Sequence, residues 1–382
     1  MNGEEVALAN CDSYHGGTVS ARVGKVFRLL GGPASLVPKG GSVFLKVNAL
    51  LGIDPGKGVT THPEVVRAVA CQFREVTDNI TIGDCPGGPA LAAHIKRAYE
   101  KCGLDQVARE VKAGLCLDTS VAQVKLPSGV KIRSVSLSRQ MVQSDCLVSI
   151  PKFKTHMLVG ITCAVKNLFG AVPGMNKFAY HSRFSDPEAF SHLLVDVAMA
   201  AKPRFHVVDA IEVMEGDGPR AGTLRHMGLI AAGRDAFAVD TLMMYAAGLD
   251  PKCNLPLAAA MARGLAHGDL SRLNLLGADI HSARLKDFRL PGGKPASARL
   301  PRALQEFFGN LISFKPSPDP ALCNGCGTCA AVCPEGAVEI SDGVAVVDGK
   351  KCIRCYCCHE LCEREAMTLQ RSLLMRLGRM NR

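Results

Sequence analysis

Cysteines gathered near the carboxyl end constrain this chain more than any other feature. Nine of its 17 cysteines lie within residues 317–382, and the first 316 residues hold the other eight one at a time. Cysteines at such density are either disulfide partners or metal ligands, and the amino-terminal sequence MNGEEVALAN contains no basic-then-apolar export leader. We therefore expect a cytoplasmic protein in which a separate carboxyl-terminal module binds metal.

The spacing of these cysteines indicates which metal group they bind. Two runs follow the same pattern, C-x2-C-x2-C-x3-C, and proline follows the first run. Bacterial [4Fe-4S] ferredoxins have this spacing, and in two-cluster members the fourth cysteine of each run binds the other cluster. Two [4Fe-4S] clusters are predicted, with Cys323, Cys326, Cys329 and Cys362 as ligands of the first and Cys352, Cys355, Cys358 and Cys333 as ligands of the second.

Residues 317–370 thus resemble a two-cluster ferredoxin, with Glu363 in place of the second proline. Paired zinc sites are disfavoured, because they would leave the third and fourth cysteines of each run unused. Cys357 is an extra cysteine, interpreted as a bystander that could substitute for a ligand. The clusters could also be purely structural, although two linked clusters are explained more simply by electron transfer.

The rest of the chain alternates short apolar runs with longer helical patterns, which predicts an α/β domain with a largely parallel sheet over residues 1–284. A linker with one amphipathic helix (301–312) is expected over 285–316, a small α+β ferredoxin-like domain over 317–370 and a basic tail over 371–382. The expected strands are 6–9, 43–47, 80–82, 147–150, 206–208 and 229–232. The expected helices are 18–30, 63–75, 90–101, 187–201 and 236–247, and hairpins are expected over 121–135 and 337–347.

Polar residues follow several of the predicted strands, and in open α/β sheets ligands bind beyond the carboxyl ends of the strands. The basic and amide groups among them suit a carboxylate or phosphate. Predicted proton-transfer residues are Lys154, His156 and His181, and predicted substrate-binding residues are Lys152, Lys166, Asn167, Asn48, Asp84, Asp209 and Glu215.

Other interpretations of these residues stay open. The basic residues could instead form a solvated face that docks the acidic module. Asp84, Asp209, Glu212 and Glu215, with His62 or His156, could bind a divalent metal. Cys11 and Cys85 could be reactive thiols, although burial as small apolar side chains is the simpler interpretation.

Charge and motifs exclude several classes of function. The formal net charge of +10 arises in residues 1–316, with 37 Lys/Arg against 27 Asp/Glu. Nucleic-acid binding is nevertheless disfavoured, because tryptophan is absent and aromatic residues are 5% of the chain. No run of 18 apolar residues indicates a membrane span. Neither GxGxxG nor GxxxxGK[ST] occurs, so nicotinamide and P-loop nucleotide sites are unsupported, whereas a flavin or a further metal stays open.

Several blocks in order resemble the domain-of-unknown-function family 362, whose members are often fused to a two-cluster ferredoxin. The similarity spans residues 4–280, and departures include Val47 for proline and Cys85 for serine. The blocks are CDSY (11–14), LKVN (45–48), VTTHPEVVRAV (59–69), GDCPGG (83–88), PKFKTH (151–156), AVKNLFGAVPG (164–174), YHSRF (180–184) and MEGDGPRAG (214–222). The resemblance implies an iron–sulfur redox protein with a functional rim, and it names no substrate.

Together these observations favour an oxidoreductase that passes low-potential electrons from the clusters to an anionic substrate or a further cofactor. The expected partner is an electron donor or acceptor protein, namely a ferredoxin, flavodoxin or reductase. One alternative is an electron carrier or metallocentre-assembly factor without small-molecule turnover. Another is a non-redox metal-dependent enzyme with structural clusters.

Overall fold

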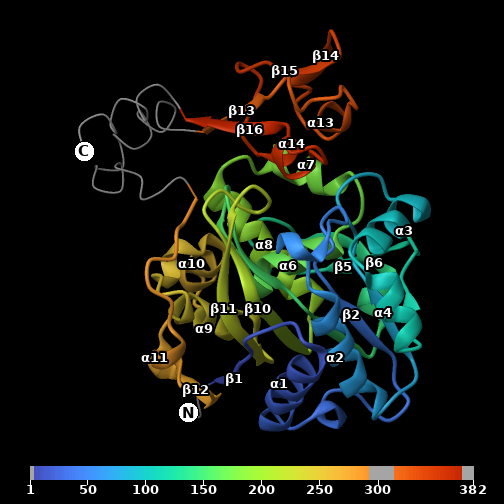
Figure 1. The fold of residues 1–382 in the computed structure, drawn as a ribbon, viewed down its shortest axis with the longest axis vertical. Helices are drawn as coiled ribbons and strands as arrows, with labels where there is room; N and C mark the ends of the chain where they lie inside the picture. Colours follow the sequence, from blue (N-terminus) through green and yellow to red (C-terminus); the bar gives the residue numbers. More distant parts are fainter. Residues whose placement is uncertain (1–3, 292–313, 372–382) are drawn as a thin grey trace.

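A mixed, mostly parallel sheet of ten strands forms the centre of the α/β domain in the computed structural model, which describes residues 4–291 and 314–371 (Figure 1). Eight strands follow the order β12-β1-β11-β10-β7-β2-β3-β4, β8 pairs with β10, and β9 pairs with β8. The strands are β1 (Glu4–Asn10), β2 (Val43–Lys46), β3 (Ile80–Gly83), β4 (Gly114–Leu115), β7 (Cys146–Ser149), β8 (Lys152–His156), β9 (Gly160–Thr162), β10 (Phe205–Glu215), β11 (Thr223–Gly233) and β12 (Leu273–Gly277).

Both faces of the sheet are buried, which explains why its strands are continuously apolar rather than alternating. In β2, Val43 and Leu45 pack against one helical layer, whereas Phe44 packs on the opposite face. The first layer contains α1 (Gly16–Leu29), α2 (Pro63–Arg74), α3 (Ala92–Lys101) and α4 (Leu104–Glu110). The opposite side carries α6 (Ala164–Asn167), α8 (Pro187–Ala201), α9 (Ala236–Ala246) and α10 (Leu255–Ala262). The domain also has three short helices: α5 (Arg139–Gln143), α7 (Asn176–Arg183) and α11 (Ile280–Ala283).

The predicted helices are present, with ends within two residues of those expected. Proline occupies the first turn of α2 and of α8, where its missing N–H costs nothing. The Asp186 carboxylate accepts a hydrogen bond from the Ala189 amide at 2.7 Å and caps α8. The largely parallel α/β sheet is confirmed.

Three local predictions were wrong. Residues 152–156 were expected to form a loop after the strand ending at Ile150, but they form β8, which is buried along its whole length and pairs with β10. β10 itself runs to Glu215, so Asp209 lies inside a strand rather than after one. The hairpin β5 (Val121–Lys125) and β6 (Ser134–Ser138) starts its second strand later than expected, because the amides of residues 130–132 donate to the Asp196 carboxylate instead.

The carboxyl-terminal module extends slightly beyond its predicted bounds, because β13 (Phe314–Pro318) pairs with β16 (Met367–Arg371). Between them lie α13 (Thr328–Ala331), the predicted hairpin β14 (Val338–Ser341) and β15 (Val344–Val347), and α14 (Cys357–Glu360). The predicted linker helix (301–312) and the tail beyond residue 371 lie outside the described residues. Within the described ranges, no helix is both long and apolar enough to cross a membrane.

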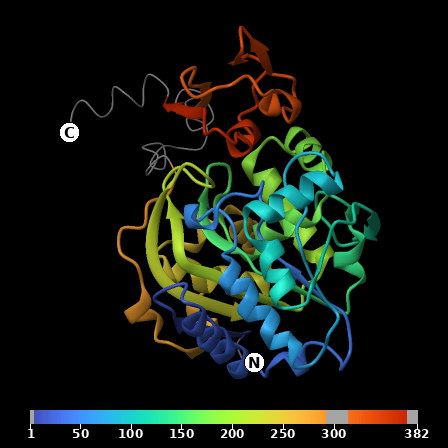
Figure 2. The ribbon, with the colours of Figure 1, turned by 45° about the vertical axis from the view of Figure 1, so that its right-hand side comes forward.

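The module sits over the end of the α/β domain, with α14 toward that domain and the β14–β15 hairpin away from it (Figures 1 and 2). At the contact, Leu361 occupies the space that a side chain at Gly87 would need, and it packs in an apolar cluster with Leu51 and Phe178. Glu363 lies 2.8 Å from the Lys101 ammonium, and its carbonyl accepts a hydrogen bond from Arg220 at 2.9 Å. Two basic side chains of the α/β domain, Lys101 and Arg220, thus bind Glu363 of the module at this contact.

Candidate functional site

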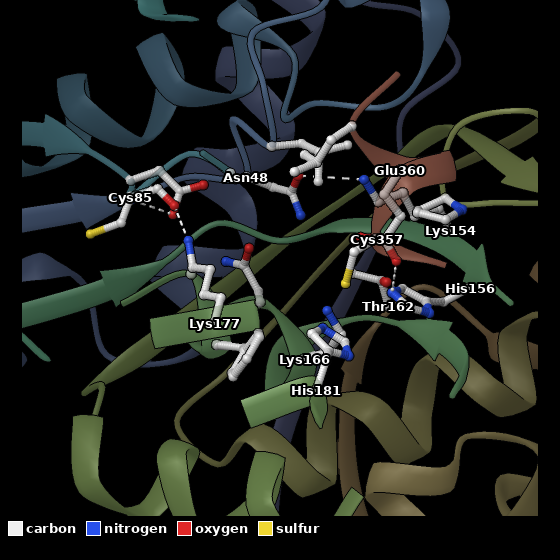
Figure 3. A pocket seen from close by; sticks show the side chains of 18 of the residues that line it. Asn48, Cys85, Lys154, His156, Thr162, Lys166, Lys177, His181, Cys357 and Glu360 are labelled. Carbon is white, nitrogen blue, oxygen red and sulfur yellow. Dashed lines mark hydrogen bonds and ion pairs between the residues drawn. The ribbon is translucent and has the colours of Figure 1, made fainter. Parts of the chain in front are cut away.

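A cavity of about 90 Å³ lies where the module meets the carboxyl ends of the central strands (Figure 3). The α/β domain contributes most of its walls, and α14 with Leu361 closes the side formed by the module. The lining residues with polar side chains are Lys46, Asn48, Asp84, Cys85, Lys154, His156, Thr162, Lys166, Asn167, Lys177, His181, Cys357 and Glu360.

Seven of the ten predicted site residues line this cavity. They come from separate parts of the chain, namely the loops after β2 and β3, strand β8 and helices α6 and α7. Burial of both faces of the sheet leaves the strand ends as the place where polar groups can gather. These seven are Lys154, His156, His181, Lys166, Asn167, Asn48 and Asp84.

Lys46 and Asp84 form a buried ion pair at the floor of the cavity. The Lys46 ammonium lies 2.8 Å from Oδ1 of Asp84 and also donates to Oδ1 of Asn167 at 3.1 Å. Asp84 further accepts hydrogen bonds from the amides of Ala49 and Cys85 at 2.8 and 2.9 Å. These contacts satisfy both charges, so the pair fixes the loops after β2 and β3 rather than offering a free charge to a ligand.

Three other lysines lack a carboxylate partner within ion-pair distance among the described residues. Lys154 donates to the Val59 carbonyl at 2.5 Å and toward Oδ1 of Asn48 at 3.4 Å. Lys177 donates to the Cys85 carbonyl, and Lys166 lies 5.3 Å from the ring centre of Phe169. Burial lowers the pKa of all three ammonium groups, to about 7 for Lys154. The cavity therefore contains three ammonium groups without an ion-pair partner of their own in the described ranges, which suits an anion.

His156 contacts the module directly. Its Nε2 lies 2.9 Å from Oε1 of Glu360, and its Nδ1 accepts a hydrogen bond from the Leu158 amide at 3.2 Å. Because Nδ1 is the acceptor, the proton of the neutral ring is on Nε2, the nitrogen that lies 2.9 Å from Glu360. Burial lowers the pKa of His156, which favours this neutral form.

Glu360 is ionised in spite of its burial. Burial alone would raise the pKa of its carboxyl, but the neighbouring His156 and the charge of Lys166 hold that pKa well below its usual range. Glu360 is therefore an internal anion on the wall of an otherwise basic cavity.

His181 lies between two aromatic rings. It stacks on Phe190 with ring centres 4.2 Å apart and meets the Phe169 ring edge-on at 5.9 Å. Burial lowers its pKa to about 3, and its Nδ1 has no hydrogen-bond partner in the part of the chain described. The ring is neutral near pH 7, with one nitrogen left for a hydrogen bond to a ligand or water.

Lys152, Asp209 and Glu215 lie elsewhere, so the expectation that they belong to the same site was wrong. The Lys152 ammonium lies 3.0 Å from Oδ2 of Asp209 and 2.5 Å from the Tyr14 hydroxyl, in a buried group that neutralises itself. Glu215 pairs with Arg289 at 2.8 Å. Lys152, Asp209 and Glu215 are each paired with an opposite charge that is distant in the sequence, and the sequence alone does not reveal these pairs.

These ion pairs also argue against the divalent-metal site proposed from the sequence, because its carboxylates are already paired with basic residues. Glu212, the remaining carboxylate of that proposal, lies 2.5 Å from Nδ1 of His226. Among the described residues, no three His, Cys, Asp or Glu side chains are grouped so that they could hold a single metal ion. Cys85 lines the cavity, but burial raises its thiol pKa to about 12 and Cys11 is buried outside it, so neither is a reactive thiolate.

The cysteines of the module fit the predicted exchange of fourth ligands. A second small cavity inside the module is lined by Cys323, Cys326, Cys329 and Cys362, the four residues assigned to one cluster. Backbone amides of Ala345 and Ala337 donate to Sγ of Cys323 at 3.4 Å and of Cys333 at 3.1 Å. Burial raises the pKa of Cys352, and the nearby Cys355 and Cys333 raise it further, which places Cys333 beside the second run. Converging thiols and amide donors are the environment of an iron–sulfur cluster.

Three charged lining residues escaped prediction from the sequence. Lys46 was assigned to the interior of a strand, although a lysine among apolar residues at a strand end signals a buried ion pair. Lys177 precedes His181 by four residues, which places both on one face of a helix. Glu360 lies between two predicted cluster ligands, and nothing in the sequence links it to β8.

Comparison with known proteins identifies the family. The model of the family described as domain of unknown function (DUF362) matches residues 43–245, and that of the 4Fe-4S binding domain matches residues 316–339. The chain belongs to the DUF362 family and carries a 4Fe-4S binding domain. It is 31% identical over 321 residues to the thylakoid-associated protein sll1697 of Synechocystis sp., with 82% of this chain and 97% of that protein covered.

Two further sequence matches concern only the module of this DUF362 protein. It is 40% identical over 52 residues to Ferredoxin-1 of Rhodobacter capsulatus, which covers 13% of this chain and 80% of that protein. It is 50% identical over 48 residues to one component of the Na(+)-translocating ferredoxin:NAD(+) oxidoreductase complex of Acetobacterium woodii, covering 12% of this chain and 14% of that component. The lactate racemase apoprotein from Thermoanaerobacterium thermosaccharolyticum matches 60% of this chain and 54% of that chain at 16% identity, and its TM-score of 0.38 is too low to relate the folds.

Proposed function

We propose that this chain is an iron–sulfur oxidoreductase that reduces a small anionic compound in the cavity between module and α/β domain. One observation carries the proposal. Helix α14 contains Cys358, an assigned cluster ligand, and its residues Cys357 and Glu360 line the same cavity as Lys154 and Lys166. The redox module and the basic pocket therefore share a wall.

The cysteines are proposed to hold two [4Fe-4S] clusters in the exchanged arrangement. When bound, each cluster can accept and release one electron, so two clusters match a two-electron reduction. A cavity thiol of Cys357, adjacent to Cys358, contributes no charge at neutral pH because its pKa is raised well above the usual value by Cys355 and by burial.

The substrate class follows from the lysines that lack an ion-pair partner among the described residues. Lys166 and Lys177 suit a carboxylate or phosphate, and the buried site makes each such contact stronger than it would be in water. Asn48 and Thr162, which also line the cavity, can donate hydrogen bonds to the same group.

Two-electron reduction of an unsaturated bond also consumes two protons. Lys154 is the side chain best suited to supply them one at a time, because its pKa of about 7 lets it donate and be recharged near neutral pH. His156 and His181 were proposed for the same role from the sequence. Since burial keeps both neutral near pH 7, we assign them hydrogen bonding and positioning instead.

We propose that the electrons come from a separate redox protein. We also propose that the present chain works in the cytoplasm. The cysteines of the described residues are all unpaired, as expected in a reducing compartment. The name of the Synechocystis relative concerns a thylakoid association of that protein, so the location of this chain stays a prediction.

The experiment is a single-turnover assay on the full chain, purified anaerobically with its iron. Reduced with dithionite and freed of excess reductant, the protein is mixed with individual carboxylate and phosphate compounds, and reoxidation is followed by visible absorption. At least one compound should reoxidise the wild type and fail with Lys154→Gln, while the surface control Lys96→Gln behaves as wild type.

Either of two outcomes overturns the proposal. If redox proteins reoxidise the chain and no small anion does, it is a carrier or an assembly factor. If a reaction on an anion proceeds equally with the clusters held oxidised, they are structural.

A further inference from the structure

The first half of the module contains no basic side chain. Between residues 316 and 349 the sequence holds five carboxylates and no Lys, Arg or His. The first bases after it, Lys350 and Lys351, open the second cysteine run. The chain as a whole has a net charge of +10, but all charged side chains of this stretch are negative, and it therefore creates a local negative field.

This stretch includes the β14–β15 hairpin, which lies on the side of the module away from the α/β domain (Figures 1 and 2). Glu339 and Asp342 are exposed there. Neither forms an ion pair or a side-chain hydrogen bond within the described ranges, whereas Glu360 and Glu363 on the inner side are paired with the α/β domain. The outer carboxylates are therefore free to meet another molecule.

Apolar side chains lie beside these carboxylates. Leu322, Ile340 and Val346 are 49%, 38% and 46% exposed, so three large aliphatic side chains of this small module reach the solvent. Ile340 lines the small cavity formed by the first cysteine set, and the Ala345 amide, on the strand paired with Ile340, donates to Sγ of Cys323. Cys326 of the same set is itself exposed. The patch thus borders the most accessible of the assigned cluster ligands.

We propose that this outer face, comprising Leu322, Ile340, Val346, Glu339 and Asp342, is the docking surface for the redox protein that supplies electrons. The proposal rests on the proposed function, since it names the donor side of the same reaction. The partner presents basic groups around an apolar centre, because an acidic partner, including a second copy of this module, would be repelled. At each encounter a reduced flavin or iron–sulfur centre of the partner would lose one electron, and a cluster held by Cys323, Cys326, Cys329 and Cys362 would gain it. Two encounters would supply one turnover.

One end of the module then receives electrons, and the other end passes them on. Electrons arrive at the outer face near Cys326 and leave at α14, on the cavity wall. Docking at one end leaves the other end seated on the α/β domain.

Cytochrome c serves as a basic redox probe, and ferricyanide as an anionic one. The dithionite-reduced full chain is mixed with each in a stopped-flow instrument over a range of salt concentrations. The rate with cytochrome c should fall as salt rises, and at low salt the double variant Glu339→Gln/Asp342→Asn should lower it by about tenfold. The ferricyanide rate should rise in the same variant. The matched control Glu75→Gln/Asp78→Asn removes two exposed carboxylates from the α/β domain and should change neither rate.

Equal effects of the test and control variants, or no effect of either, would overturn the docking surface. Cluster content measured from the visible spectrum keeps loss of iron separate from loss of docking. Reoxidation by a cavity anion should be unchanged in the test variant. If the test variant slows the reaction with cytochrome c but no anion reoxidises the protein, the proposed function is wrong and the docking surface is still supported.

Discussion

Glu360 of the cysteine-rich module lies 2.9 Å from Nε2 of His156, which belongs to the central sheet more than 200 residues earlier in the chain. The contact joins α14 to β8 at the wall of the basic cavity. Glu360 and Asp84 are the two carboxylates among the lining residues, and Asp84 is committed to Lys46. An incoming anion therefore meets Glu360 as its internal competitor.

Replacing Glu360 by Gln should strengthen anion binding. The amide keeps the size and shape of the carboxylate beside Nε2 of His156, but it no longer offsets the charge of Lys166. We expect sulfate to bind roughly tenfold more tightly, equivalent to about 1.4 kcal/mol, with a stability loss of about 1–2 kcal/mol. Titration calorimetry and denaturant unfolding would measure both. Weaker sulfate binding would show that Glu360 organises the site rather than competing for it.

Sulfate binding should depend on the proton of Lys154. Its pKa is lowered to about 7, so the ammonium is charged below that pH and the charge is lost as pH rises through it. Affinity for sulfate, whose own charge does not change in this range, should therefore be highest below pH 7 and decline above it. In Lys154→Arg the guanidinium stays charged, and the decline near pH 7 should disappear. A persistent decline in that variant would assign the proton to another group.

Substitution of single cysteines should separate the two proposed clusters. Cys362→Ala removes a ligand of the set that lines the inner cavity of the module, and Cys333→Ala removes one from the other set. Each variant should lose the spectroscopic signal of a different cluster, and Cys357→Ala should retain both. The measurement is iron content with electron paramagnetic resonance of the reduced protein. Loss of the same signal in both variants would refute the exchange of fourth ligands.

Gly170 provides a test of the cavity floor. A Cβ at this position would lie 2.3 Å from the Lys46 ammonium and 2.4 Å from the Asp84 carboxylate. Gly170→Ala should force the buried pair apart and lower the free energy of unfolding by about 3–5 kcal/mol. Gly349→Ala, whose Cβ would meet nothing within 4 Å, is the matched control. If denaturant unfolding gives Gly170→Ala the same free energy of unfolding as the wild type, the ion pair can move apart at little cost.

Much of the fold could be predicted because its signals are local. Pro63 and Pro187 mark the first turns of their helices, and the cysteine spacing defines the module without any tertiary information. β8 was missed because Pro151 resembled the end of a strand, while the pairing that makes residues 152–156 a strand comes from β10, about 50 residues later.

The site was predicted only in part, for a similar reason. Residue types at strand ends indicated Lys154, His156 and Lys166, but which charges stay free depends on partners distant in the sequence. Lys152 is neutralised by Asp209 and Lys154 has no such partner among the described residues, although the two lysines are two positions apart. Glu360 reaches the cavity only because the module docks as it does.

The measurement that tests the central claim most directly is the proximity of a bound anion to the reduced module. Phosphate is added to the dithionite-reduced full chain, and the coupling of its phosphorus nucleus to the cluster spin is measured by pulsed electron paramagnetic resonance. The cavity shared by α14 and the lysines predicts a resolved phosphorus coupling that excess sulfate removes and that Lys166→Gln weakens. Phosphate that binds by calorimetry without any such coupling would place the anion elsewhere and contradict the account.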